Sequence, residues 1–598
     1  MLDTSFALGL NFLLTWQAWR TDPQRPRLLH FVSMLGDEAS KAELLREASD
    51  HPELLPLADE LAAQWNGLLA GTHRLAFDGG RVMLTLGVGD ASSWAWLKAQ
   101  GVCADSVYLD GISHHGRPWT MHMFKALARC CHTGTRVTSG TAHKHVREGL
   151  QQCGFILEEP LGLPSEHDPL QAVFNPPWQP RQKTALSWPK PRSAQTCLVI
   201  GAGLAGAAAA ASLARRGWQV TVLDAEPAPA GGASSLPAGF LAPHVSPDDG
   251  ILSRLSRSGL RATWQAVAEL LQAGDGQRSG VLQRRFDASS RLPADWPETG
   301  AHWSQEAAPA LLDEECKADA QAPLWHGAGG WVKPARLVEA LLNTPGVTWR
   351  CGQAVSSLRR AECPADTAWS EDPAACKASS AAPNWQALDA QGKTMAEACL
   401  VVVAAGPGSV QICASGSVQA PPLQPVRGQI VWGAWPIGVD FASFESALPT
   451  SPVNGLGGLI PVFPSPRAGE PQPHWLLGAT FERGESQPLI RAEDTAQLQD
   501  RLTQLWPPAA KALASQISAG QAQSWPGVRC SSPDRLPLVG PLDDKKAPGL
   551  WLCTAMGSRG LTFAVLCGEL LAAWANDEPL PLEKRLAQHL LASRFNPR

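Results

Sequence analysis

Three glycines, Gly201, Gly203 and Gly206, follow the pattern G-x-G-x-x-G, which lets backbone approach a phosphate and a helix start close to a strand. An apolar run at 196–200 precedes them, and an alanine-rich helical stretch follows. Asp224 lies 18 residues beyond Gly206, where a carboxylate can accept hydrogen bonds from ribose hydroxyls. A glycine-rich turn that binds nothing is the alternative. The context instead favours a dinucleotide site.

Three further segments extend this site and favour FAD over NAD. Ser234 lies in a Gly/Ser-rich loop soon after Asp224, and a buried-type strand ends at Gly406. Residues 551–574 have the pattern of a strand, a turn that contains Gly557 and Gly560, and a long helix. The N-terminus of that helix can stabilise negative charge at the far end of the cofactor.

The rest of the chain must position these groups, and its composition limits the number of domains and the class of protein. The 598 residues are 44% hydrophobic and 18% charged, which is enough for several folding units with large cores. A net charge of −5 excludes a globally basic nucleic-acid binder. No C-x-x-C occurs among the 14 cysteines, so no metal site is indicated. Apolar runs are too short to span a membrane, and a reducing, cytoplasmic setting is expected.

A proline-rich and basic stretch at 176–195 indicates a linker. It separates a domain at 1–175 from a larger one at 196–598. Short basic segments at 20–27 and in the linker could neutralise RNA phosphates, and a solvated surface is the alternative reading.

Several motifs of the chain resemble the MnmC family of bifunctional tRNA-modifying enzymes. They are WPGVRCSSPDRLPLVGPL at 525–542, MGSRGLTFAVLCGELLA at 556–572, GGWVKPARLVEALL at 329–342 and GLNFLLTWQAW at 9–19. The C-terminal part is also similar to the glycine oxidase/D-amino-acid oxidase family of FAD enzymes. The resemblance implies an α/β protein: an N-terminal, methyltransferase-like doubly wound sheet and a C-terminal FAD-binding, Rossmann-like domain with a mostly antiparallel substrate sheet.

The resemblance also implies a reaction on tRNA. The FAD-dependent domain would oxidatively remove the carboxymethyl group of 5-carboxymethylaminomethyl-2-thiouridine, giving 5-aminomethyl-2-thiouridine. An S-adenosylmethionine-dependent domain would then make 5-methylaminomethyl-2-thiouridine. Two alternatives stay open: a small-molecule amine or amino-acid oxidase of the glycine oxidase type, and a tRNA-binding scaffold in which flavin is only structural.

A substrate of this kind carries a carboxylate, and arginine binds carboxylates through two parallel hydrogen bonds. Arg529 and Arg559 occupy positions that line the flavin site in the related oxidases, and we expect both to be catalytic. Structural or solvated roles are the alternatives. Arg427 is a weaker candidate for contact with substrate or flavin.

Other polar residues are expected to be structural. We expect His244 and His326 to form structural hydrogen bonds, with catalysis as the alternative, and Lys333 to face solvent, with the site as the alternative. An ion pair between Asp534 and Arg535 in a turn is the structural reading of that motif.

The N-terminal domain departs from the family's first motif, which is roughly G-F-G-T-G-L-N-F. Here the stretch at 5–12 is SFALGLNF, so that Gly9 is the one glycine retained for backbone contact with S-adenosylmethionine. Ala7 replaces another of the glycines, and each added Cβ crowds the site. These replacements favour a degenerate domain that docks tRNA or covers the oxidase over a working methyltransferase.

Other parts of the presumed methyl-donor site are partly retained. Leu35 stands where the family has an acidic residue for the ribose, and Asp37 or Glu38 could compensate only in a shifted register. Asp90 is expected to contact the adenine, and Asp110 survives from a further motif. Because Met1 falls almost on the glycine motif, we expect the sheet to be N-terminally truncated and to lack its first strand.

Overall fold

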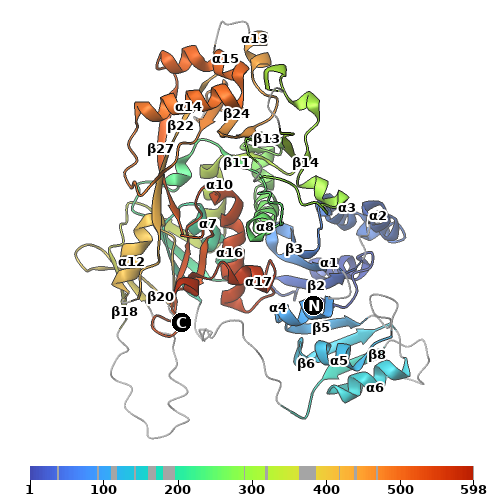
Figure 1. Cartoon of the computed structure of the whole chain (residues 1–598). Coiled ribbons are helices and arrows are strands. Elements are labelled where there is room, and N and C mark those ends of the chain that lie inside the picture. Colours follow the sequence, from blue (N-terminus) through green and yellow to red (C-terminus); the bar gives the residue numbers. More distant parts are fainter. Residues whose placement is uncertain are drawn as a thin grey trace. The chain divides into compact units, whose positions relative to one another are not determined.

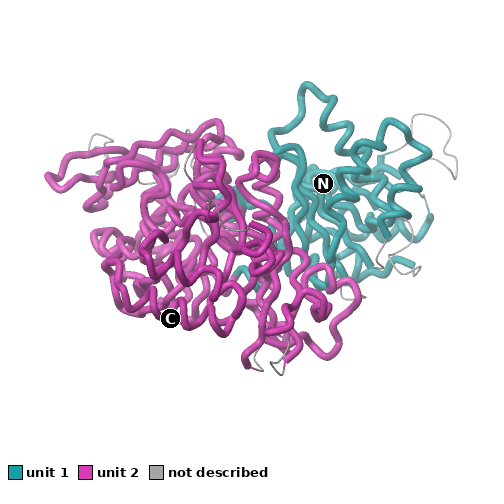
Figure 2. The backbone as a smooth tube through the Cα atoms, turned by 90° about the horizontal axis from the view of Figure 1, so that it is seen from above, with its two compact units in different colours: residues 1–187, 573–587 teal, residues 188–572, 588–598 magenta. Residues whose placement is uncertain are grey.

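The computed structural model describes the chain except for residues 37–39, 90–92, 110–117, 141–142, 159–169, 179–194, 288–289, 317–320, 362–384, 417, 437–440, 467–468 and 597–598. Two compact units make up the chain (Figure 2). Unit 1 comprises residues 1–187 and 573–587, and unit 2 comprises residues 188–572 and 588–598. Most of the predicted linker falls outside the described residues.

Unit 1 is built on an eight-stranded mixed sheet of order β3-β4-β2-β1-β5-β6-β8-β7 (Figure 1). The central strands β4, β2, β1, β5 and β6 are parallel, and β3, β8 and β7 pair antiparallel to their neighbours. The strands are β1 (Leu2–Asp3), β2 (Leu29–Leu35), β3 (Gly71–Phe77), β4 (Val82–Val88), β5 (Ala104–Leu109), β6 (Cys131–Ser139), β7 (Phe155–Glu158) and β8 (Leu170–Phe174).

Alternation along β2 shows that both faces of this sheet are covered. Val32 and Met34 pack in one hydrophobic cluster with residues of α4 (Ser93–Gln100), α5 (Met121–Ala128) and α6 (Lys144–Gln152). Phe31 and Leu35 pack in the other, with residues of α1 (Leu10–Thr21), α2 (Lys41–Ala48) and α3 (Leu55–Gln64). Successive side chains of a strand point to opposite faces. The predicted doubly wound sheet is confirmed.

The expectation that the first strand is missing was wrong. Leu2 and Asp3 form β1 at the centre of the sheet, where Leu2 pairs with Val32 on one side and Val107 on the other. Both residues are buried. Two residues suffice because neighbouring strands supply the hydrogen-bonding partners on each side.

Unit 2 contains a six-stranded sheet of order β17-β10-β9-β21-β29-β28, parallel except for the β28–β29 pair. The strands are β9 (Thr196–Ile200), β10 (Gln219–Leu223), β17 (Val347–Arg350), β21 (Leu400–Val403), β28 (Leu538–Pro541) and β29 (Leu550–Thr554). Helices α7 (Leu204–Arg215) and α16 (Gly560–Asn576) are linked by Glu569, which pairs with Arg215 at 2.7 Å and Arg216 at 3.0 Å. The predicted strand, turn, helix and strand around the glycines are confirmed.

A second, nine-stranded sheet carries the mostly antiparallel pairing that the resemblance implied. Its strands are β13 (Val281–Gln283), β14 (Gln305–Glu306), β15 (Leu324–His326), β22 (Gln424–Ala434), β23 (Val453–Gly455), β24 (Gly457–Pro464), β25 (Pro473–Gly478), β26 (Glu482–Arg483) and β27 (Gln523–Ser531). Val431 packs with α14 (Ala492–Leu505) and α15 (Pro507–Ser518) on one face, while Ile430 and Trp432 pack in a separate cluster.

None of the helices in the described part of the chain combines the length and apolarity that crossing a membrane requires. In the same residues, no group of three or more His, Cys, Asp or Glu side chains is arranged to hold a metal ion.

Candidate active site

The glycine turn between β9 and α7 leaves no room for side chains. Gly201 has φ of +112°, and a Cβ there would lie 2.6 Å from the carbonyl oxygen of Ala404. A Cβ on Gly206 would lie 1.8 Å from the carbonyl oxygen of Gly201. Both positions therefore require glycine, because the helix start and the neighbouring strand approach the turn closely.

Two polar side chains organise this turn. The Asp224 carboxylate accepts hydrogen bonds from the backbone N–H of Ala202 and, at 2.8 Å, from that of Glu226. The Ser234 hydroxyl accepts from the N–H of Leu204 at 3.0 Å, in the first turn of α7. Asp224 thus ties the end of β10 to the glycine turn, while Ser234 lies at the helix N-terminus, where an anion is stabilised.

A cavity of about 630 Å³ opens along these groups. Its lining includes most of the predicted cofactor residues, namely Gly201, Gly203, Asp224, Ser234, Gly406, Gly557 and Gly560. Gly206 lies behind them, against the Gly201 carbonyl. A volume in the usual range of ligand pockets, a side-chain-free turn, a helix N-terminus and an acidic strand end fit a dinucleotide such as FAD.

Arg529, on β27, is a cation on the wall of this cavity. Its Nη2 donates to the carbonyl oxygen of Thr480 at 2.9 Å, and its Cζ lies 5.0 Å from the ring centroid of Phe481. No carboxylate among the described residues pairs with it. Burial lowers the pKa of the guanidinium. An anionic ligand would therefore gain a desolvated, uncompensated positive charge.

Gly428 on β22 makes this placement possible, and it was not among the predicted site residues. A Cβ on Gly428 would lie 2.1 Å from Nη2 of Arg529 and 2.6 Å from the Thr480 carbonyl oxygen. The arginine thus crosses β22 over a residue without a side chain. The usable signal was Val-Arg-Gly at 426–428, a glycine inside a strand, which often marks close approach.

The predicted catalytic role of Arg559 stays a prediction. Its neighbours Ser558 and Gly560 line the cavity, but Arg559 is not among the lining residues. Burial, and then the nearby charge of Arg535, lower the pKa of its guanidinium. The predicted ion pair between Asp534 and Arg535 is wrong, because Asp534 pairs with Arg594 at 2.8 Å.

Arg427 is a structural residue rather than a substrate contact. Its guanidinium is fully buried, lies 2.7 Å from Asp494 and donates to the carbonyl oxygen of Leu489. A second carboxylate, Glu482, lies 3.4 Å away. This network fixes the segment after β25 against β22 and α14, and Arg427 does not line the cavity.

Of the three other polar residues considered, the two histidines have hydroxyl or amide neighbours, and Lys333 differs from the expectation. His326 is buried between Ser304 (2.8 Å from Nδ1) and Gln283 (2.7 Å from Nε2), and burial lowers its pKa to about 4. His244 lies 3.0 Å from the Ser253 hydroxyl, and burial together with the Arg559 charge lowers its pKa to about 4. Lys333 does not face solvent as expected.

The ammonium of Lys333 instead lies 3.0 Å from Asp275 and donates to the carbonyl oxygen of Ser465. Both members of this ion pair are largely buried. Its neighbour Pro334, at the start of α10 (Pro334–Leu342), lines the cavity. The ion pair therefore supports the cavity wall from behind.

In unit 1, the turn from β1 to α1 has the form of a methyl-donor site with altered residues. Gly9 caps α1 with φ of +82°, whereas Ala7 has φ of +46° despite its Cβ. Asp3, a buried carboxylate at the end of β1 that sequence reasoning missed, accepts from Ser33 Oγ and the Ser5 N–H, each at 3.3 Å. The sequence signal for Asp3 was an acidic residue directly after the apolar residues Met1 and Leu2.

Within the described residues, the end of β2 offers no acidic side chain to accept hydrogen bonds from a ribose. Leu35 is buried in an apolar cluster there. The predicted Asp90, with Asp37, Glu38 and Asp110, lies outside the described residues. The residues described at these strand ends therefore do not fit S-adenosylmethionine fully.

Two family models match separate parts of the chain. Residues 196–574 match the family of FAD dependent oxidoreductases, and residues 52–175 match a family of S-adenosyl-L-methionine-dependent methyltransferases. The "tRNA 5-methylaminomethyl-2-thiouridine biosynthesis bifunctional protein MnmC" of Polaromonas sp. (strain JS666 / ATCC BAA-500) is 50% identical over 99% of this chain and 90% of its own. The protein of the same name from Delftia acidovorans (strain DSM 14801 / SPH-1) is 48% identical over 100% of this chain and 91% of its own.

Among solved structures, glycine oxidase from Geobacillus kaustophilus aligns with a TM-score of 0.49 and 19% identity, over 67% of this chain and 100% of that one. The full-length relatives and the two matched domains give the same assignment. The chain belongs to the MnmC family, in which an FAD-dependent oxidoreductase and an S-adenosylmethionine-dependent methyltransferase domain form one polypeptide.

Proposed function

We propose that residues 196–598 catalyse the FAD-dependent removal of the carboxymethyl group from 5-carboxymethylaminomethyl-2-thiouridine in tRNA. Arg529, a cation on the cavity wall with no described carboxylate partner, is the observation that carries this proposal. The names of the full-length relatives support tRNA as the substrate. The product is 5-aminomethyl-2-thiouridine. We propose that the reaction takes place in the cytoplasm.

Bound FAD supplies a two-electron oxidation of the C–N bond next to the substrate carboxylate. The amine would lose a hydride, for which bound FAD is the acceptor, and a proton, which passes to solvent; water would then cleave the resulting imine to the aminomethyl group and glyoxylate. Arg529 holds the carboxylate through the donors that Thr480 does not use. The glycine turn, Ser234 and Asp224 would hold the cofactor's pyrophosphate and ribose.

The end of the cavity near Arg529 has no described side chain suited to act as a base. Arg529, Cys530, Trp525 and Thr554 are among the polar residues lining the cavity, and burial raises the pKa of the Cys530 thiol to about 11. The substrate amine must therefore arrive neutral. We expect kcat/KM to rise with pH as that amine loses its proton.

The test is an anaerobic mixture of the FAD-loaded protein with tRNA that carries the carboxymethylaminomethyl group. Bleaching of the flavin absorbance, with release of glyoxylate, is the expected result. Glycine and N-methylglycine serve as controls for the small-molecule oxidase. Bleaching by these amines and not by the tRNA would refute the proposal in favour of that alternative.

For residues 1–175 we propose a domain that accepts the aminomethyl tRNA product. Its family match supports methyl transfer, whereas Ala7 and Leu35 weaken the methyl-donor site. Adding S-adenosylmethionine after the first reaction, and measuring the nucleoside mass, tests whether the added methyl group appears.

A further inference from the structure

Residues 479–483 carry an exposed aromatic ring and an exposed cation beside the cavity. Ala479 lines the cavity, and Phe481 is 54% exposed although it is a large apolar residue. Arg483, on β26, is exposed and has no carboxylate partner among the described residues. In an extended chain, residues two apart share a face. Ala479, Phe481 and Arg483 therefore follow one another along one face, outward from the cavity.

The strand register places this face next to Arg529. Val426 on β22 pairs with Arg483 on one side and with Arg529 on the other. The Thr480 N–H donates to the Gln429 carbonyl oxygen at 3.0 Å, which continues the same register. Phe481 consequently stands across from Gly428, the residue over which the Arg529 guanidinium passes. The cation–ring distance of 5.0 Å follows from this arrangement.

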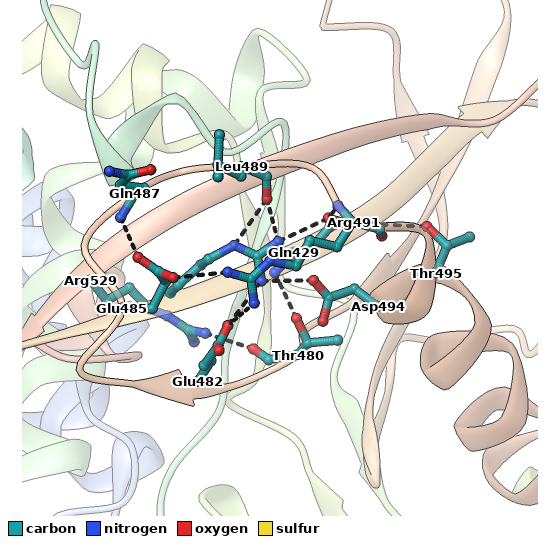
Figure 3. A network of polar contacts seen from close by, with 11 residues as sticks. Gln429, Thr480, Glu482, Glu485, Gln487, Leu489, Arg491, Asp494, Thr495 and Arg529 are labelled. Atoms are coloured by element: carbon teal, nitrogen blue, oxygen red, sulfur yellow. Dashed lines mark hydrogen bonds and ion pairs between the residues drawn. The ribbon is translucent and has the colours of Figure 1, made fainter.

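The segment is held firmly although its side chains are exposed. Arg491 lies 2.6 Å from Glu482 and 2.8 Å from Glu485 (Figure 3). The buried Arg427 binds the Leu489 carbonyl oxygen in the same loop. Phe481 is thus presented on a fixed backbone, and its exposure is not explained by a loose loop.

The dimensions match the proposed substrate. Four single bonds of roughly 1.5 Å join the pyrimidine ring to the carboxyl carbon, so the ring lies about 5 Å from the carboxylate. With the carboxylate on Arg529, the ring can reach Phe481, whose ring centroid lies 5.0 Å from the guanidinium carbon. Single-stranded RNA sites combine aromatic platforms for bases with cations for phosphates.

We propose that Phe481 stacks on the modified base and that Arg483 binds a phosphate of the same RNA segment. The pair would select an RNA-linked substrate over a free amino acid, because neither group contacts the carboxymethylamino portion. This inference rests on the proposed function and deepens it: Arg529 recognises the carboxylate, Phe481 the base and Arg483 the backbone.

The test uses the FAD-loaded full chain with modified tRNA, and separately with the free modified nucleoside. Phe481→Ala should raise KM for both by roughly 5- to 100-fold, as expected for loss of one stacked base. Phe481→Trp should restore KM. Arg483→Gln should raise KM for the tRNA alone, and should lower the slope of log KM against log salt by about 1.

Two controls separate recognition from structural damage. Phe441, also 54% exposed, lies on α13 (Phe441–Ala447) away from the cavity lining, and Phe441→Ala should leave KM unchanged. Glycolate, a small carboxylate, should inhibit wild type and Phe481→Ala with the same inhibition constant. A parallel loss of glycolate binding, or an unchanged KM for the nucleoside, would overturn the stacking role. A wild-type protein inert toward the tRNA would instead refute the proposed function itself.

Discussion

Replacing Arg529 tests the carboxylate site directly. One of its donors is used by the Thr480 carbonyl oxygen at 2.9 Å, and the others are available to a substrate. Hydrogen bonds to charged groups contribute about 1.5–3 kcal/mol each. Loss of two such bonds in Arg529→Gln should therefore cost at least about 3 kcal/mol of transition-state binding, a fall in kcat/KM of more than roughly a hundredfold.

Arg529→Lys should be intermediate, because an ammonium keeps the charge but cannot form the two parallel bonds of a guanidinium. We expect a fall of roughly 10- to 100-fold. The assay is the rate of anaerobic flavin bleaching by modified tRNA, at several substrate concentrations.

Arg501→Gln is the matched control. Arg501 also donates to a backbone carbonyl oxygen, that of Ala479 at 3.2 Å, but it does not line the cavity. Its kcat/KM should stay near that of wild type. If Arg529→Gln keeps FAD and loses less than tenfold in kcat/KM, the carboxylate is bound elsewhere and the reasoning fails.

Three further outcomes are expected. Gly206→Ala should abolish FAD binding, measured as the flavin-to-protein absorbance ratio, because its Cβ would lie 1.8 Å from the Gly201 carbonyl oxygen. His326 has a pKa of about 4 in the fold against 6.5 in the unfolded chain. The free energy of unfolding should therefore fall by about 3 kcal/mol as the pH falls from 6.5 to 4. In urea unfolding, His326→Gln should show a smaller fall over that range, and an equal fall would contradict the assignment. Leu35→Glu should tighten S-adenosylmethionine binding about tenfold by calorimetry, since a charge-assisted bond to the ribose is worth about 1.5–3 kcal/mol; unchanged binding would locate the ribose elsewhere.

The residues predicted to bind the cofactor lie in local motifs. The glycine turn, Asp224 and the turn at Gly557 depend on contacts within short, recognisable segments, and the cavity brings them together. Arg529 was predicted from a motif, and it lies on the cavity wall.

Long-range packing accounts for what the sequence left out. Gly428 matters only because Arg529 crosses it from the neighbouring strand, and Phe481 only because the register sets it opposite that glycine. The burial of Lys333 was missed because its partner, Asp275, lies 58 residues away in the chain. No local pattern carries such pairings.

Residues 573–587 bring unit 1 a segment from the far end of the chain. Within that unit, Arg74 donates to the Pro579 carbonyl oxygen at 2.6 Å, and the Lys584 N–H donates to Gln100 at 3.1 Å. A gene cut once at the linker would therefore encode an N-terminal product without these partners. Separate expression or natural fission of the two halves would require the C-terminal segment to be supplied in trans or grafted onto the first half. The fusion of the two parts in one polypeptide is what supplies unit 1 with residues 573–587.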